Sequence, residues 1–181
     1  MYTVAVIVGS LRKESINKKL ARALEKIGAD LFAFKYVDIS GVPPFNQDEE
    51  GSLPKAVADM KAIVASADAV LFVTPEYNRS MPGVLKNALD WGSRPYGDNV
   101  WAGKSAAMAG SSGGNVGTAV AQSHLRSVLG FLGMALTVQP ELYLKDTPGL
   151  IADDGSVENE GTQEFLRSFL EAFDAWIRKT R

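Results

Sequence analysis

The sequence predicts an α/β fold in which helices cover both faces of one parallel sheet. Short apolar runs alternate with segments whose apolar residues recur at helical spacing, and this alternation repeats five times. The length of 181 residues and the hydrophobic fraction of 46% fit one domain with a sizeable core. We therefore expect residues 1–181 to form a single domain.

The first half of the chain provides two strands and two helices. Residues 3–8 are nearly all apolar, rich in β-branched side chains and followed by Gly9, as expected for a buried parallel strand. Apolar residues then recur at helical spacing: Ile16, Leu20, Ala23, Leu24 and Ile27. A second strand is predicted over residues 31–37, and a helix over residues 54–67, where Pro54 suits the first helical position.

The second half continues the alternation. Residues 69–74 form the clearest buried strand, and Pro82 is expected to start the next helix. Further strands are predicted over residues 104–109 and 134–138. The helix between them carries Ala121, Leu125, Val128, Leu129 and Leu132, and the last helix carries Phe165, Phe169, Ala172, Phe173 and Trp176. Five such units fit a flavodoxin-like three-layer sandwich with strand order 2-1-3-4-5, whose ligands bind at the carboxyl ends of the strands.

The loop after the first strand, residues 9–17, predicts a phosphate site. It leads into a helix N-terminus, which presents unpaired N–H groups and a partial positive charge. Short polar donors come from Ser10, Ser15 and Asn17, and Ile16 lies among them. The guanidinium of Arg12 adds a fork that can grip phosphate. Taken alone, this loop is equally compatible with an ordinary capped helix start and a surface arginine.

The loop after the third strand, residues 74–83, offers a place for a flat ring. Pro75 and Pro82 restrict its shape, while Tyr77 and Asn78 offer an aromatic face and an amide. These are the contacts that a planar heterocycle with imide-like edges requires. A plain turn, or a glycosylation acceptor at residues 78–80, are the alternatives.

The loop after the fourth strand, residues 110–117, is built from small residues. Ser111, Ser112, Gly113 and Gly114 allow a close approach between backbone and ligand. A flexible connector would have the same composition. All three loops lie on one edge of the predicted sheet, and their joint occurrence favours a ligand site over three coincidences.

Composition excludes several other classes of function. The chain has no cysteine and one histidine, which rules out disulfides, thiolate catalysis and a His-rich metal site. A net charge of −2 argues against a general affinity for nucleic acid or an anionic membrane. No apolar run reaches the ~18 residues of a membrane span. The N-terminus is interpreted as a strand rather than a signal peptide, so a cytoplasmic location is the expectation.

Common nucleotide and hydrolase motifs do not fit. No G-x-G-x-x-G follows the first strand, no G-x-S-x-G occurs, and a phosphate loop ending at Gly103-Lys104-Ser105 would need glycine where Asp98 stands. His124 lies beside the apolar stripe of the long helix and is interpreted as a packing or interface residue. The acidic groups at 48–50 and 153–154 are interpreted as solvated loops rather than metal sites.

Together the three loops resemble the NADPH-dependent FMN reductase family, closest to its bacterial quinone and chromate reductase branch. The resemblance covers nearly the whole chain. It is carried by Gly9-Ser10-Leu11-Arg12-Lys13 with Ser15 and Asn17, by Pro75-Glu76-Tyr77-Asn78 with Ser80, Pro82 and Gly83, and by residues 85–91 and Gly103-Lys104.

The resemblance implies bound FMN and an NADPH or NADH donor. It implies a phosphate grip by Ser10, Arg12, Ser15 and Asn17, a ring lined by Pro75, Glu76, Tyr77 and Asn78, and closure by Ser111, Ser112, Gly113 and Gly114. Hydride would pass through the flavin to a quinone, chromate, an azo compound or free flavin. Tyr77 and Arg79 are the candidate substrate contacts, and no catalytic side chain or metal is required.

The resemblance also implies a homodimer or homotetramer. Independently, Val120 and Phe131 lie outside the main apolar stripe of the long helix, which is consistent with a partner surface or with a wide core face. Two other readings remain open. One is a flavodoxin-like electron carrier without pyridine-nucleotide activity, although such carriers are usually more acidic. The other is an interaction module that has lost its cofactor.

Overall fold

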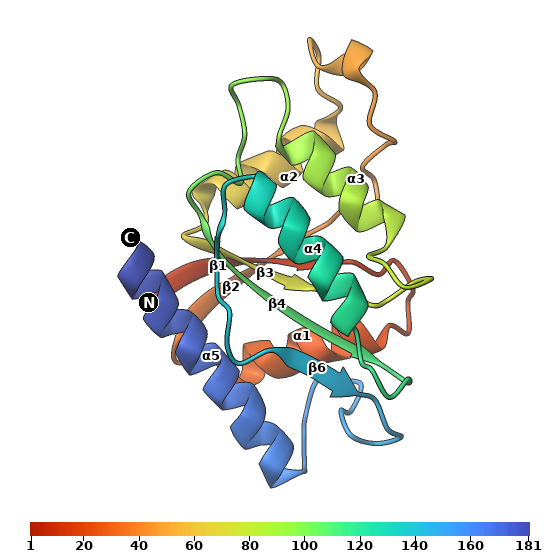
Figure 1. The fold of residues 1–181 in the computed structure, drawn as a ribbon, viewed down its shortest axis with the longest axis vertical. Coiled ribbons are helices and arrows are strands. Elements are labelled where there is room, and N and C mark those ends of the chain that lie inside the picture. Colours follow the sequence, from red (N-terminus) through yellow and green to blue (C-terminus); the bar gives the residue numbers. More distant parts are fainter.

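The computed structural model describes residues 1–181 and contains one parallel six-stranded sheet (Figure 1). The strands are β1 (Tyr2–Val8), β2 (Phe32–Val37), β3 (Ala69–Val73), β4 (Ser105–Ser112), β5 (Ala135–Leu136) and β6 (Leu142–Lys145). The helices are α1 (Ile16–Ile27), α2 (Lys55–Ser66), α3 (Gly83–Gly92), α4 (Ala119–Phe131) and α5 (Glu160–Thr180), with a short 3-10 helix at Gln47–Glu49. The strand order is β2-β1-β3-β4-β5, so the predicted flavodoxin-like order is confirmed.

Helices cover both faces of the sheet and create two cores. α1 and α5 lie on one face, and α2, α3 and α4 on the other (Figure 1). Because successive side chains of a strand point to opposite faces, Val4 and Val6 belong to the first core and Ala5 and Ile7 to the second. Burial on both faces explains why the central strands are almost wholly apolar.

The predicted fourth strand was too short. β4 runs from Ser105 to Ser112 rather than from 104 to 109, because its last four residues pair with β6. Gly110, Ser111 and Ser112, expected in a loop, are therefore held by the sheet. This rigidity places the Ser111 backbone at a fixed point of the carboxyl edge.

The predicted fifth strand, residues 134–138, was wrong in extent. Only Ala135–Leu136 form β5, beside the amino half of β4. β6 then pairs with the carboxyl half of β4. Between the two pieces stands Pro140, which has no N–H to donate to a sheet. The fifth strand is thus divided in two, and the sheet gains a sixth.

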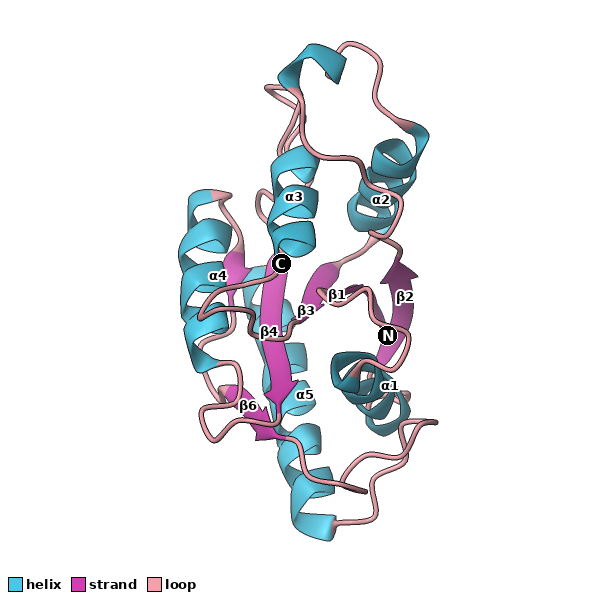
Figure 2. Cartoon of the chain, turned by 90° about the vertical axis from the view of Figure 1, so that its right-hand side faces the viewer, coloured by secondary structure: helices cyan, strands magenta, loops and turns pink.

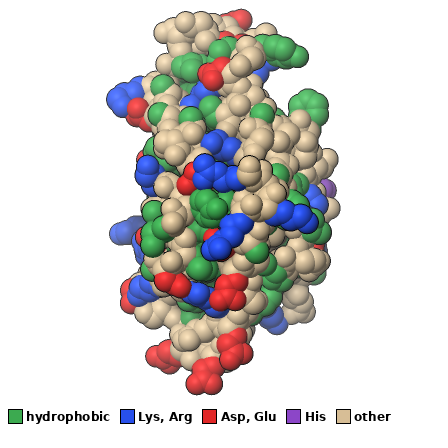
Figure 3. All heavy atoms as spheres, turned by 90° about the vertical axis from the view of Figure 1, so that its left-hand side faces the viewer, with side chains coloured by type: hydrophobic (Ala, Val, Ile, Leu, Met, Phe, Trp, Pro, Cys, Tyr) green, Lys and Arg blue, Asp and Glu red, His purple; other side chains and the backbone are tan.

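The carboxyl ends of β1, β3 and β4 lie on the right of Figure 1, the side that faces the viewer in Figure 2. Both termini and α5 lie on the opposite side (Figure 1). On that opposite face, lysine and arginine side chains are interspersed with acidic ones (Figure 3). None of the helices combines the length and the apolar character that crossing a membrane demands.

Candidate cofactor site

Hydrogen bonds between neighbouring strands bring the three loops to one edge. The Gly9 amide donates to Val73 at 2.9 Å, and the Thr74 amide donates to Ala109 at 2.9 Å. The loops that follow β1, β3 and β4 therefore start side by side, at the switch point where flavodoxin-like folds bind ligands.

The first loop ends in an open helix N-terminus. Ser15 occupies the N-cap position of α1, yet its hydroxyl makes no capping bond, and the first turn holds no acidic residue. Ser10 and Ser15 are each 3% exposed, and neither hydroxyl has a protein partner. The side chain of Arg12 is exposed and makes no ion pair or hydrogen bond. Unused donors around a positive helix end suit an anion.

Asn17 joins the first loop to the end of β4. Its Nδ2 donates to the Ser111 carbonyl oxygen at 2.9 Å, and its Oδ1 accepts from the Ser111 amide at 2.9 Å. The residue is 1% exposed. Half of the amide's hydrogen-bonding capacity, one donor and one acceptor position, is thus used within the protein, and Asn17 fixes the spacing between the two loops.

The end of β4 holds an unsatisfied hydroxyl. Ser111 is 2% exposed, and its Oγ has no hydrogen-bond partner. Gly110 makes this close packing possible, because a Cβ there would lie 2.1 Å from Thr118 Oγ1 and 2.4 Å from the Thr74 carbonyl oxygen. A buried hydroxyl without a partner costs about 1–3 kcal/mol, so such a group at a ligand edge fits a polar ligand atom.

The loop after β3 folds into a tight two-residue turn. The Tyr77 amide donates to the Ser80 carbonyl oxygen at 2.9 Å, and the Ser80 amide donates to that of Tyr77 at 3.0 Å. The two central residues are left-handed, with φ of 50° at Asn78 and 63° at Arg79, as in a type I′ turn. Pro75 is buried, whereas Tyr77 is 45% exposed at the edge.

The carboxylate of Glu76 is directed at the N-terminus of α4 and at Arg79. Its Oε2 accepts from the amides of Val120 and Ala121 at 3.0 and 3.1 Å, and its Oε1 accepts from Arg79 at 3.2 Å. The side chain is only 8% exposed. The sequence placed Glu76 in the loop expected to line a ring, but gave no sign that its side chain caps α4.

Each loop also presents one large apolar side chain to solvent. Leu11 is 46% exposed, Tyr77 45% and Val116 48%. Because single exposed apolar residues are common, the informative point is that one stands on each of three adjacent loops. Together they offer walls for a flat apolar ring beside the polar groups of the edge.

Two cavities flank the edge. One of about 510 Å³ lies beside Ser10 and Leu11 and includes Tyr36, whose pKa is raised by burial and by its hydrogen bond to Glu25. The other, also about 510 Å³, is lined by Ser80 and His124, whose Nδ1 lies 3.0 Å from Ser80 Oγ. His124 is exposed, so it is not a core residue.

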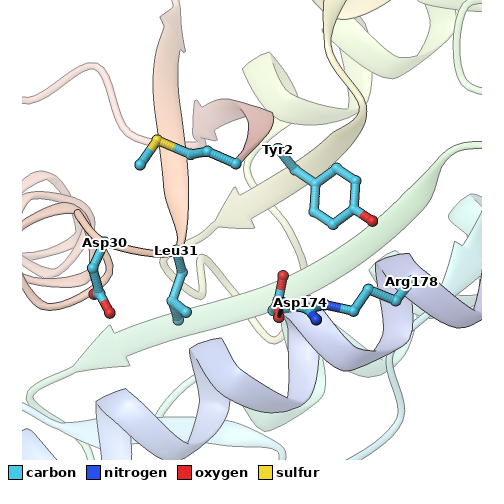
Figure 4. Close-up of a pocket in the computed structure, with 6 residues that line it drawn as sticks. Tyr2, Asp30, Leu31, Asp174 and Arg178 are labelled. Atoms are coloured by element: carbon cyan, nitrogen blue, oxygen red, sulfur yellow. Dashed lines mark ion pairs between the residues drawn. The ribbon is translucent and has the colours of Figure 1, made fainter.

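A third cavity, of about 400 Å³, lies at the other end of the strands. Tyr2, Leu31 and the ion pair between Asp174 and Arg178 line it (Figure 4). The acidic loop residues Asp153 and Asp154 are paired with lysines of α1. At this end of the strands the charged groups that line the cavity are therefore paired, unlike Arg12 at the carboxyl edge.

Comparison with known proteins decides the family. A family model described as NADPH-dependent FMN reductase matches residues 2–148 of the chain. The chain belongs to this family. The prediction made from the three loops is thereby confirmed, because residues 2–148 include all of them.

Similar proteins agree with this assignment of an FMN reductase family member. A 2-hydroxy-1,4-benzoquinone reductase from Burkholderia sp is 49% identical over 178 residues, which span 98% of this chain and 97% of the relative. A quinone reductase from Pseudomonas putida is 44% identical over 182 residues, spanning 100% of this chain and 97% of the relative.

Solved structures support the fold. FerB, a flavoenzyme NAD(P)H:(acceptor) oxidoreductase from Paracoccus denitrificans, superposes with a TM-score of 0.96 and 45% identity, covering 99% of this chain and 98% of that one. A mutant flavodoxin from Pseudomonas aeruginosa superposes with a TM-score of 0.61 at 18% identity, which supports the fold alone. The reductase thus shares the flavodoxin-like architecture.

Proposed function

We propose that this member of the family is an NAD(P)H-dependent reductase that binds FMN and reduces quinones. The observation that carries the proposal is the set of polar groups without protein partners at one sheet edge: the hydroxyls of Ser10, Ser15 and Ser111 and the guanidinium of Arg12. Two relatives above 40% identity are named as quinone reductases, which supports quinones as the acceptor class.

The unpartnered groups divide between a phosphate and a ring. Ser10, Arg12 and Ser15 would hold the FMN phosphate at the start of α1, where the Ile16 amide is among the free donors of the helix. The remaining Nδ2 hydrogen of Asn17 can join them. The positive helix end favours the doubly negative phosphate, and the guanidinium of Arg12 would add the counter-ion.

The ring would lie across the carboxyl edge. The backbone of residues 75–78 and the Asn78 amide would meet its polar edge, with the Tyr77 ring as a wall. Ser111 to Gly114 would close the other side, and the buried Ser111 Oγ would gain the partner that it lacks. Gly113 and Gly114 are exposed and carry no side chain, which suits a close approach of the backbone to a ligand.

Bound FMN would supply the hydride chemistry, while the protein supplies binding and orientation. The net reaction is NAD(P)H + H⁺ + quinone → NAD(P)⁺ + hydroquinone, in which two electrons and one proton leave the nucleotide and a second proton comes from solvent. Chromate, azo compounds and free flavin are further acceptors that the same exposed edge would admit. No protein acid or base is needed for this balance.

The decisive experiment is an absorption spectrum followed by anaerobic titration. Purified protein should show a flavin spectrum, lose it on adding NADPH, and regain it on adding benzoquinone. A flavin spectrum that NADPH and NADH leave unchanged would instead indicate an electron carrier. Protein that binds no FMN when it is supplied would contradict the proposal altogether.

We also propose that Arg79 contacts the anionic nucleotide donor. Its side chain is 71% exposed and stands on the ring-lining turn. A left-handed arginine is uncommon, and glycine would adopt this turn with less strain, so the arginine is favoured by something other than backbone conformation. Arg79→Ala should raise the KM for NADPH about tenfold, the loss of roughly one charge-assisted contact. Unchanged KM values for NADPH and NADH would contradict this role.

Self-association through α4 completes the proposal. Val120, His124, Ser127 and Phe131 recur along one side of the helix, none of them is a lysine, arginine, aspartate or glutamate, and Phe131 is 90% exposed. A stripe that mixes apolar and uncharged polar side chains around an exposed phenylalanine can pack against its own copy in a symmetric dimer. We propose a homodimer, or a tetramer built from it, with α4 at the contact.

A further inference from the structure

The strained turn after β3 is attached to α4 at two points. Glu76, just before the turn, accepts from the Val120 and Ala121 amides in the first turn of the helix. Ser80, at the end of the turn, lies 3.0 Å from His124 one helical turn later. The shape of the turn therefore depends on a helix that starts about forty residues further along the chain.

Glu76 provides the carboxylate that accepts from the amides at this helix end. The N-cap residue Thr118 makes no side-chain capping bond, and the first turn of α4 contains no acidic residue. Two charge-assisted bonds to a positive helix end hold Oε2 firmly. Because Oε2 of Glu76 is held by the two amides, its Oε1 stays in position to accept the hydrogen bond from Arg79.

The turn needs such support. Asn78 and Arg79 are both left-handed; asparagine tolerates that region, whereas for arginine it costs about 1 kcal/mol or more. The preferred sequence for a type I′ turn is Asn-Gly, so Arg79 stands where glycine would be easier. The ion pair with Glu76 draws the Arg79 side chain back toward α4 and so opposes relaxation of the turn.

We propose that Glu76 is a positioning residue, which holds the turn of residues 77–80 in its ring-binding shape by anchoring Arg79 to the N-terminus of α4. Its carboxylate need not touch the flavin. The effect on FMN rests on the proposed function, whereas the effect on the shape of the turn does not.

The test is a double-mutant cycle between Glu76→Gln and Arg79→Gly. Glutamine can still accept from the α4 amides through its oxygen but loses the charge that holds Arg79, whereas glycine removes the strain that needs holding. Glu76→Gln should weaken FMN binding about tenfold. The contact that is lost is the ion pair between Glu76 and Arg79, which holds the turn, and not a contact to FMN itself. In the Arg79→Gly background the same change should weaken it by no more than about twofold.

A second readout needs no cofactor. In protein freed of FMN, hydrogen exchange of the Tyr77 and Ser80 amides should accelerate in Glu76→Gln and return to the original rate in the double variant. Asp174→Asn is the matched control, because Asp174 is a 12% exposed carboxylate paired with a 67% exposed arginine (Figure 4). It should change neither readout.

The outcomes separate the two proposals. Unchanged exchange and affinity in Glu76→Gln, or equal losses in both backgrounds, would overturn the positioning role. If the original protein binds no FMN, the proposed function fails, and the exchange measurement alone decides the role of Glu76. Glu76→Ala, which removes both contacts, should additionally accelerate exchange at Val120 and Ala121.

Discussion

Polar side chains at the carboxyl edge fall into two groups at the residue scale. The side chains of Asn17 and Glu76 are buried and form hydrogen bonds within the protein. Asn17 joins the first loop to β4, and Glu76 joins the loop after β3 to α4. Ser10, Arg12 and Ser15 have no protein partner. Because the first group shapes the site and the second remains free to bind, their substitutions should have different consequences.

Arg12 gives the first prediction. Arg12→Ala should weaken FMN binding about 10- to 100-fold, because a charged contact to phosphate is worth roughly 1.5–3 kcal/mol. Thermal stability without FMN should be unchanged, since the side chain is exposed and contacts nothing. Fluorescence titration of FMN measures the affinity. Lys13→Ala is the control, and Arg12→Ala protein that stays yellow after dialysis would refute the assignment.

The sequence indicated that the three loops meet at one sheet edge, but not what every side chain in them contacts. A serine-rich helix start predicts a phosphate grip only together with the two neighbouring loops, because alone it fits an ordinary capped helix as well. The cap formed by Glu76 joins residues 44 and 45 positions apart, and Asn17 meets Ser111 across 94 positions. No local periodicity encodes such partners, so these roles became visible only with the fold.

At the scale of strands and helices, too, the sequence predicts local pattern but not long-range partners. The alternation of apolar periods predicted the strand order and the helices, because burial on two faces leaves a strong pattern. The extension of β4 to Ser112 and the division of the fifth strand were missed. The extension and the division both depend on which strand pairs with the small residues after Ala109. The composition of a Gly-Ser segment does not indicate its pairing partner.

Gly110 gives a prediction at the scale of β4. Gly110→Ala should lower the free energy of unfolding by at least about 1–3 kcal/mol, the usual effect of overpacking. Its Cβ would clash with Thr118 and with the Thr74 backbone. FMN affinity should fall as well, because β4 carries Ser111. Urea unfolding and FMN titration provide the measurements.

The control lies in the same segment. Gly113→Ala introduces a Cβ with nothing within 4 Å and no positive φ. Its stability should stay within about 0.5 kcal/mol of the original protein, as for most surface substitutions. If both variants lose stability equally, general loop stiffness rather than the Gly110 contact would be responsible.

The segment between β6 and α5 gives a prediction about pH. Lys19 and Lys26 of α1 lower the pKa of the Asp153 and Asp154 carboxyls below 3.8 by hydrogen bonding, aided at Asp154 by Ser156. A lowered folded-state pKa means stabilisation that is present above the unfolded value and lost as pH falls through the folded one. The attachment of this segment to α1 should therefore weaken below about pH 4.

Hydrogen exchange of residues 150–157, corrected for the intrinsic effect of pH, measures this attachment. Exchange should be faster at pH 3 than at pH 5, with little change in global stability because the carboxylates are exposed. Asp154→Asn should show the faster rate already at pH 5. Equal rates for the variant and the original protein at pH 5 would contradict the ion-pair explanation.

At the scale of the whole molecule, the two ends of the sheet have different characters. The carboxyl edge gathers unpartnered donors and exposed Leu11, Tyr77 and Val116, whereas the charged side chains of the opposite edge are largely paired with one another. α4 runs beside the carboxyl edge and supports its turn through Glu76. A partner packed on α4 would thus stand next to the site and act on the helix that shapes it.

Phe131 tests that arrangement. Its side chain is 90% exposed, and burying a phenylalanine contributes about 1.5–3 kcal/mol, twice over in a symmetric contact. Phe131→Glu should therefore convert the dimer to monomer at micromolar concentration, as measured by light scattering after gel filtration. Tyr96→Glu is the control, because Tyr96 is 92% exposed and lies outside α4. If Phe131→Glu leaves the mass unchanged while Tyr96→Glu lowers it, the contact lies at the 93–104 loop instead. If the original protein is already a monomer, the α4 contact does not exist.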